Sequence, residues 1–260
     1  MKHLTAIVLL TFAFNGTSQT IITEAPSVSA SATTVPKNTL QIESGMSASS
    51  NNYWTTISLP YALFRLGLSN RWELRMNNSF NVRKYNGSIF SNPSTNYGFG
   101  SFQVGTKFQF IKNPESKTKI AAIANVTIPS HNSNSRAASL NFSFSHQLGS
   151  KHSIGYNLGY NPSYALSISS PDIISNVNYS LIYGYSLNSK LSIFGEFFGN
   201  YHYYPAVFDP TTSLSVDFGI MYLLRDNIQI DYAYAHGRGF TNQFDFHSLG
   251  FNILLNSKKN

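Results

Sequence analysis

The charged side chains of this 260-residue chain are few, and several recur where apolar and polar residues alternate along the sequence. Charged residues make up 11% of the chain, against roughly 25% in ordinary soluble domains. Those that we select as a candidate luminal charge cluster fall on the polar faces of alternating segments: Arg65, Glu73, Arg75, Lys107, Glu196, Asp217 and Asp231. Phe194 and Phe198 share the polar phase with Glu196, so they form a candidate aromatic patch.

Arg65 and Glu73 stand symmetrically about Ser69, in the turn between two alternating segments. The spacing predicts that they face each other across two antiparallel strands. With Arg75 and Lys107 they would make a charged cluster inside a barrel. Such a cluster can be a structural ion-pair network or can steer solutes, and both interpretations stay open.

The acidic residues Glu196, Asp217 and Asp231 belong to later segments and would line the opposite wall. Basic and acidic walls facing each other predict a transverse field across a pore. The same arrangement could equally bridge the lumen and plug it. Phe194 and Phe198 could contact an aromatic solute, or they could only fill space in the lumen as structural side chains.

Other chemistry finds little support in the sequence. Cysteine is absent, and no nucleophile elbow, metal-spaced histidine cluster or phosphate loop is present. His146, His152 and His202 have serine neighbours, which leaves a lipid-modifying hydrolase on the outer face of a barrel as an alternative. We expect no catalysis, no cofactor and no metal. The net charge is +7, but the basic residues are scattered and many sit in turns, so we expect no nucleic-acid partner.

Period-two alternation, which is typical of strands, positions these residues. It recurs at 39–48, 53–66, 72–82, 101–110, 119–128, 137–148, 152–161, 176–187, 190–203, 212–224, 228–236 and 244–255. The sequence therefore predicts an all-β fold, an antiparallel transmembrane β-barrel of about 12 strands. Phe244 and Phe246 are out of phase with the end of the last segment, which predicts a bulge near His247.

The composition of the two faces separates a membrane barrel from a soluble one. The polar face is mostly Ser, Asn, Gly and Thr, which suits a lumen and makes a poor surface for a soluble protein. Aromatic residues stand near the ends of the apolar faces, as in interfacial girdles: Trp72, Phe110, Tyr160, Tyr201 and Tyr222. Apolar residues such as Trp72 and Met76 should therefore face lipid, and Glu73, Arg75 and Asn77 should face the lumen.

The connections predict the orientation in the membrane. Short turns at 68–71, 112–117, 149–151, 188–190 and 225–227 alternate with longer links at 83–99, 129–135, 161–175, 203–211 and 237–243. Short turns would face the periplasm and long loops the outside.

Three regions are expected along the chain. Residues 1–18 have the basic start and short apolar core of a signal peptide, residues 19–37 would be a periplasmic segment or a partial plug, and residues 38–260 would form the barrel. In the last strand, Ser248, Gly250, Ile253 and Leu255 fit a polar-x-Gly-x-x-apolar-x-apolar pattern. That pattern resembles the signal read by the barrel-assembly machinery, which we expect as a partner together with outer-membrane lipid.

Four stretches carry a resemblance to a known family: "ITEAPSVSASATTVPKNTLQIESG" (22–45), "LFRLGLSNRWELR" (63–75), "GFGSFQVGTKFQF" (98–110) and "ANVTIPSH" (124–131). They resemble the outer-membrane β-barrel family of transporters of the phenol meta-pathway type, over roughly the N-terminal half. Asn38 stands where that family commonly has Gly, and Ala25 replaces a usual Arg. The resemblance implies an outer-membrane barrel.

These observations predict a channel of the bacterial cell outer membrane that passes small solutes, including aromatic or apolar ones, by passive diffusion. A barrel of about 12 strands encloses a narrow lumen, which suits small solutes. A structural or surface barrel without transport is the main alternative.

Overall fold

The computed structural model describes residues 21–87, 92–113, 115–130, 137–166, 171–204, 208–238 and 243–256. The expected signal peptide, residues 1–18, lies outside the described residues. Within the described part of the chain, no helix is long and apolar enough to cross a membrane.

The described regular structure consists of strands. In chain order they are β1 (Thr39–Asn51), β2 (Trp54–Gly67), β3 (Trp72–Tyr85), β4 (Ser94–Phe99), β5 (Phe102–Gln109), β6 (Thr118–Ile128), β7 (Ala137–Gln147), β8 (His152–Tyr160), β9 (Ser163–Leu166), β10 (Pro171–Ser186), β11 (Leu191–Tyr204), β12 (Phe208–Arg225), β13 (Ile228–Arg238) and β14 (Gln243–Asn256).

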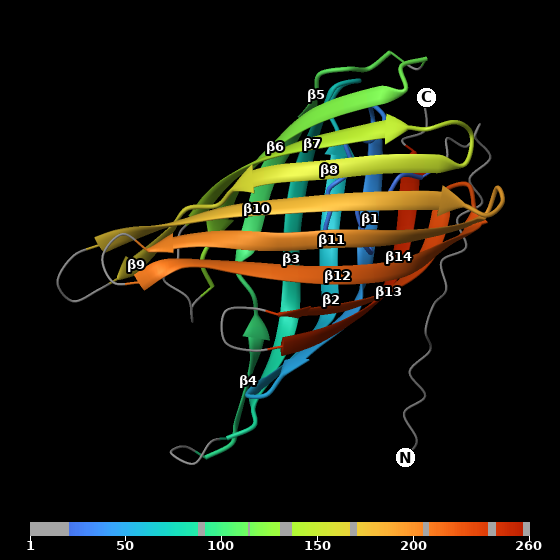
Figure 1. The fold of residues 1–260 in the computed structure, drawn as a ribbon. Coiled ribbons are helices and arrows are strands. Elements are labelled where there is room, and N and C mark those ends of the chain that lie inside the picture. The colour runs from blue at the N-terminus through green and yellow to red at the C-terminus, as the bar shows by residue number, and fades with distance from the viewer. Residues whose placement is uncertain are drawn as a thin grey trace, which may run out of the picture.

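All strand pairings are antiparallel, and they close into a barrel (Figure 1). The last strand β14 pairs with the first strand β1 along its whole length, and β10 pairs with both β8 and β11. The strands β4 and β9 add no position to the ring, because β4 extends the β3–β5 pairing and β9 extends the β8–β10 pairing. The prediction of an antiparallel barrel of about 12 strands is confirmed.

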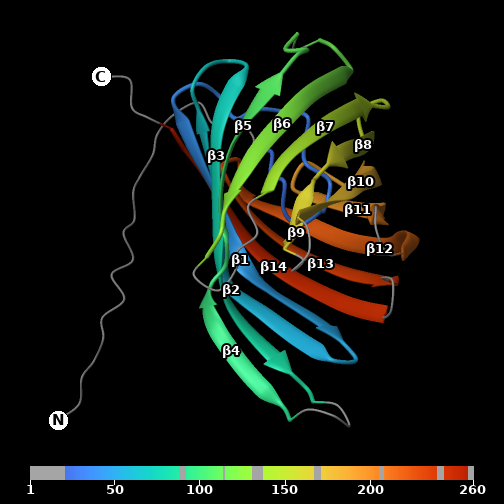
Figure 2. The ribbon, with the colours of Figure 1, turned by 90° about the vertical axis from the view of Figure 1, so that its left-hand side faces the viewer.

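One end of the barrel, the turn end, carries the short connections 68–71, 110–117, 148–151, 187–190 and 226–227. The opposite end, the loop end, differs from the prediction. The connection between β1 and β2 is short, and much of the expected link 83–99 is the β3–β4 ribbon, which projects beyond the neighbouring strands (Figures 1 and 2). Beyond lipid both faces of a strand meet water, so the apolar alternation fades while the backbone ladder continues.

The bulge predicted near His247 is wrong. Strand β14 keeps a continuous register with β1 and with β13 through this residue. Phe246 shares its face with Ser248 and lines the lumen, so its phase reflects an aromatic residue pointing inward. Register shifts lie elsewhere. One is in β2, between Ser58 and Tyr61, where Pro60 cannot donate to the ladder, and others are in β11, between His202 and Tyr204, and in β12, between Leu223 and Arg225.

The barrel buries polar side chains and exposes apolar ones. Its largest fully buried side chains are Arg65, Lys107, Gln41, Gln109, Glu43, Glu73 and Glu196. The outward residues include Trp72, Met76, Leu158, Phe197, Phe218 and Leu249. The expected girdle residues Trp72, Phe110, Tyr160, Tyr201 and Tyr222 are also exposed. This pattern inverts that of a soluble barrel and fits an outer surface in contact with lipid.

The two faces of β3 give a direct test of this orientation. Replacing outward Met76, which is 37% exposed, with Arg should destabilise the folded barrel by roughly 2–4 kcal/mol at mid-bilayer depth. Replacing inward Asn77, which bonds Gln103 in the lumen, with Arg should be mild. Urea-dependent folding into lipid vesicles measures both variants, and the opposite ranking would overturn the orientation.

Candidate functional site

The predicted charged cluster lies in the lumen near the turn end, on the wall formed by β1, β2, β3 and β5. In the register, Arg65 stands opposite Arg75, and Gly67 stands opposite Glu73. The expected direct pairing of Arg65 with Glu73 is therefore displaced by two residues. Because the displacement is even, both side chains keep the lumen face. They meet diagonally, with Arg65 Nε 3.0 Å from Glu73 Oε1.

The Arg65 guanidinium uses all of its donors. The Nε and Nη2 atoms of Arg65 donate hydrogen bonds to the Glu73 carboxylate. The Nη1 atom donates to Glu43 Oε1 at 2.9 Å. The remaining donors reach backbone carbonyls of the N-terminal segment, Ile22 at 3.0 Å and Thr33 at 2.9 Å. A guanidinium has five N–H groups, so this fully buried side chain leaves none of them unpaired.

We call residues 21–38, which precede β1, the luminal segment, because they run inside the barrel (Figure 2). Its Glu24 accepts hydrogen bonds from Arg75 and Lys107. Arg75 also contacts Glu73 at 2.9 Å. Three cations of the wall (Arg65, Arg75 and Lys107) thus meet three carboxylates (Glu24, Glu43 and Glu73), and the cluster is balanced in charge.

Glu24 holds its charge because of this setting. Burial raises the pKa of its carboxyl, but the nearby charges of Arg75, Lys107 and Arg65 outweigh burial and hold that pKa well below the ordinary value. A carboxyl whose pKa is lowered on folding stabilises the folded state above its unfolded pKa. That contribution is lost only as pH falls through the lowered folded pKa. Attachment of the segment should therefore persist at neutral and mildly acidic pH.

The luminal segment crosses the full width of the barrel. Val28 donates its backbone N–H to Glu196 Oε2 at 2.9 Å, and the Ser29 hydroxyl also bonds Glu196. Ala30 exchanges two hydrogen bonds with the Asn157 side chain, at 2.6 and 3.1 Å. In the ring of strands, β3 and β11 stand six positions apart out of twelve. The segment therefore links opposite walls.

The segment then returns to the wall it left. Thr34 and Val35 donate their backbone N–H groups to Gln109 and Glu73, at 3.1 and 2.8 Å. The chain leaves the lumen past Gly67, where any Cβ would lie 1.9 Å from the Pro36 carbonyl oxygen. Asn38 begins the turn into β1 with a φ of 59°. This left-handed conformation explains why glycine suits that position in the related family.

The predicted acidic residues also lie in the lumen, and the structure brings two of them together. Glu196 stands directly opposite Asp217 in the register of β11 and β12. Asp231 lies apart from them, near the turn end, where Gln229 and Asn252 donate to it. Among the described residues, none of the three carboxylates forms an ion pair with a basic side chain. The basic wall is neutralised locally and the acidic wall is not, which differs from the two opposed walls expected.

The predicted aromatic residues face the lumen at two levels. Phe194 is buried against Gly219, where a Cβ would meet its ring at 2.2 Å. Phe194 also lines a cavity of about 190 Å³ between the luminal segment and the wall of β7, β8, β10, β11 and β12. Phe198 lies two positions further toward the loop end on the same face of β11, beyond Glu196. Phe194 contacts a cavity, whereas Phe198 does not line any of the cavities described here.

Sequence reasoning missed several residues of the network. Glu24 and Glu43 complete the charge balance, and Gln109 and Asn157 hold the backbone of the segment. Glu43 could have been found, because it alternates with Leu40 and Ile42 on the polar face of its strand. No periodicity identifies Glu24, since its segment has no regular period, and the only signal for it is its place in the first stretch of the family resemblance.

Two of the three histidines considered for a hydrolase, His146 and His152, bond other groups. His146 contacts the hydroxyls of Thr118 and Tyr156 at 3.0 and 3.4 Å, and His152 contacts the Tyr183 hydroxyl at 2.6 Å. Among the described residues, neither His146 nor His152 bonds a serine hydroxyl. Within the described ranges, no group of three or more metal-ligating side chains converges.

Glu24→Gln tests whether the ion network holds the luminal segment. Removing one partner of a buried ion pair costs roughly 3–5 kcal/mol, and here Arg75 and Lys107 would both lose a carboxylate. We expect faster hydrogen exchange at the amides of Val28 and Val35 while the amides of the strands stay protected. Glu115→Gln, in an exposed turn, is the control. Unchanged exchange in Glu24→Gln would show that the network does not anchor the segment.

Comparison with solved structures finds barrels with similar folds. The COG4313 outer membrane channel from Pseudomonas putida F1 is 12% identical, with a TM-score of 0.67 over 86% of this chain and 98% of that one. The NanC porin is 12% identical with a TM-score of 0.55, covering 82% and 98%. The translocator domain of the autotransporter NalP from Neisseria meningitidis is 8% identical with a TM-score of 0.52, covering 82% and 88%. At such identities these likenesses establish the fold.

Comparison with known sequences is more specific. No curated protein sequence matches this chain significantly. The sequence profile of a family described as "MetA-pathway of phenol degradation" matches residues 23–255. The match extends well beyond the N-terminal half that carries the visible motifs, and it includes both the luminal segment and the barrel. The chain therefore belongs to the family of the MetA pathway of phenol degradation.

Proposed function

We propose that this protein is a channel of the bacterial outer membrane that passes small solutes by passive diffusion, with the luminal segment acting as a partial plug. The observation that carries the proposal is a closed barrel with a lipid-type outer surface and a polar lumen. The similar fold of a protein described as an outer membrane channel supports it. In this setting the turn end faces the periplasm and the loop end faces the outside.

Cavities on both sides of the luminal segment support passage. One of about 380 Å³ lies toward the loop end, lined by Tyr61, Asn78 and Phe246. Another of about 500 Å³ lies at the turn end. The cavity beside Phe194 shares Ser27 and Ser29 with the first and Met221 with the second. Small solutes would pass the segment along this side, where the wall carries Ser and Gly.

The lining of that passage favours small solutes with apolar surface. Ile182, Phe194 and Met221 contribute apolar surface beside hydroxyl groups of the wall and of the segment. The charge-balanced network on the opposite wall has a structural role in this proposal, since its donors are used within the protein. Membrane lipid and the solute are the partners, and neither catalysis nor a cofactor is required.

A matched pair of substitutions on β8 tests the route. Ser153 lines the cavity beside Phe194, whereas Leu158, on the opposite face of the same strand, is 55% exposed and does not line it. In planar lipid bilayers, the unmodified protein should give discrete conductance steps. Ser153→Trp should lower the conductance severalfold because the indole fills the gap, and Leu158→Trp should leave it unchanged.

The same recordings decide between transport and the main alternative. A correctly folded barrel that never conducts, and that does not speed solute entry into liposomes, would favour a structural or surface role. Equal conductance in both variants would place the route elsewhere. Turnover of phospholipid or lipopolysaccharide by the purified protein would be needed to support a hydrolase.

A further inference from the structure

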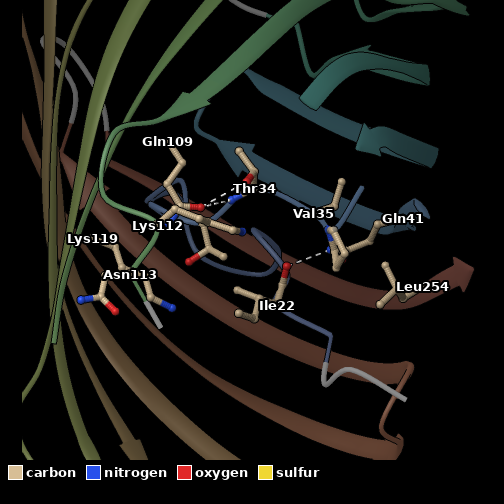
Figure 3. A pocket seen from close by; sticks show the side chains of 11 residues that line it. Ile22, Thr34, Val35, Gln41, Gln109, Lys112, Asn113, Lys119 and Leu254 are labelled. Carbon is tan, nitrogen blue, oxygen red and sulfur yellow. Dashed lines mark hydrogen bonds between the residues drawn. The ribbon is translucent and has the colours of Figure 1, made fainter. Parts of the chain in front are cut away.

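A separate pocket of about 230 Å³ opens at the turn end, behind the luminal segment. Figure 3 shows its two sides: the apolar side chains of Ile22, Val35 and Leu254 lie opposite the polar group that includes Lys112 and Lys119. Gln41 and Gln109 also line it, but they use their side-chain N–H groups on the carbonyls of Ile22 and Ile111 and on Glu43. Besides the Asn113 amide and the Thr33 hydroxyl, the free polar donors of the pocket are the two ammonium groups.

The two lysines are close to each other and lack an acidic partner. Neither forms an ion pair with a carboxylate in the part of the chain that the structure describes. Partial burial lowers the pKa of Lys112, and the neighbouring charge of Lys119 lowers it further, while Glu73 acts in the opposite sense. Glu73 cannot neutralise Lys112 directly, because it already bonds Arg65, Arg75 and the Val35 N–H.

Two unpaired cations beside an apolar surface select for a particular ligand chemistry. An anion would relieve the repulsion between the ammonium groups, and charge-assisted hydrogen bonds to it would be strong. The apolar side would add affinity only for a ligand with an apolar body. We propose that this pocket binds small organic carboxylates with an apolar body. The proposal names a solute class for the proposed channel, and the role of the pocket in transport rests on that channel function.

The surroundings of the pocket favour anions as well. Four of the short turns carry basic residues, Arg71, Lys112, Lys117, Lys151 and Lys190, and Arg225 ends β12 beside the fifth turn. The same connections contain two acidic residues, Glu115 and Asp226. Such an excess of one sign raises the local concentration of counter-ions. The rim would thus gather anions from the periplasm, and the pocket would select among them.

Equilibrium binding of benzoate to the purified full-length protein, measured by calorimetry in detergent micelles, tests the proposal. Replacing both Lys112 and Lys119 with Met keeps most of the side-chain volume and removes both charges. Affinity for benzoate should fall at least about tenfold. Replacing Lys151 and Lys190, which line a different cavity of the same rim, with Met is the control and should change affinity less than about twofold.

Two further probes separate charge from apolar body. Benzyl alcohol, a neutral analogue, should bind at least about tenfold more weakly than benzoate, and inorganic phosphate should bind more weakly too. Equal affinity for phosphate, equal loss in both double variants, or no benzoate binding would each overturn the proposal. Because binding is measured without transport, a barrel that binds benzoate through these lysines but never conducts would refute the channel and leave the site standing.

Discussion

The placement of one guanidinium organises the lumen. Arg65 projects from β2 into a space shielded from water, where an unpaired charge would cost several kcal/mol. Its five donors are met by two wall carboxylates and two backbone carbonyls of the luminal segment. The strands alone therefore cannot satisfy Arg65. The segment supplies the acceptors that the wall lacks. The hydrogen bonds from Arg65 to the carbonyls of Ile22 and Thr33 therefore favour a segment that stays inside the lumen.

The carboxylates of the wall work in the same way. Glu43 accepts the backbone N–H groups of Glu24 and Ala25, and Glu196 accepts that of Val28 from the opposite side. An irregular segment exposes its own backbone groups, because it has no neighbouring strand to pair with. Side chains that project from rigid strands replace that missing ladder. A chain without secondary structure thus holds a defined path across the barrel.

The two walls of the barrel present different side chains to the luminal segment, so the lumen is asymmetric. The wall of β1 to β5 is joined to the segment by an ion network, whereas the wall of β7 to β12 bonds it through Asn157 and Glu196 and otherwise presents mainly Ser, Gly, a few apolar side chains and Asp217. Space remains on the second side because those side chains are small. The same sequence stretches that carry the family resemblance supply Glu24, Glu43, Arg65, Glu73, Arg75 and Lys107. In this protein the family motif is thus largely the attachment site of the segment.

Much of the fold could be predicted from the sequence, because lipid imposes a strict pattern on each strand. The alternation around Trp72 and Met76 assigns the outward face, and the side chains of Arg65, Glu73 and Lys107 are fully buried on the other face. The phase of Phe244 and Phe246 was misinterpreted as a bulge, because an aromatic residue that faces the lumen looks like one that faces lipid. The ends of the strands at the loop end were missed because no alternation marks them.

The sequence by itself determined which face of each strand is polar, since that property depends only on alternating residues within one strand. The tertiary structure decided which groups the polar side chains in the lumen contact. The diagonal meeting of Arg65 and Glu73 follows from the register, and the pairing of Arg75 with Glu24 depends on the path of a segment without any period. Closing the barrel sets the distance that the luminal segment spans, because only the closed ring brings β3 and β11 to opposite sides of one narrow lumen.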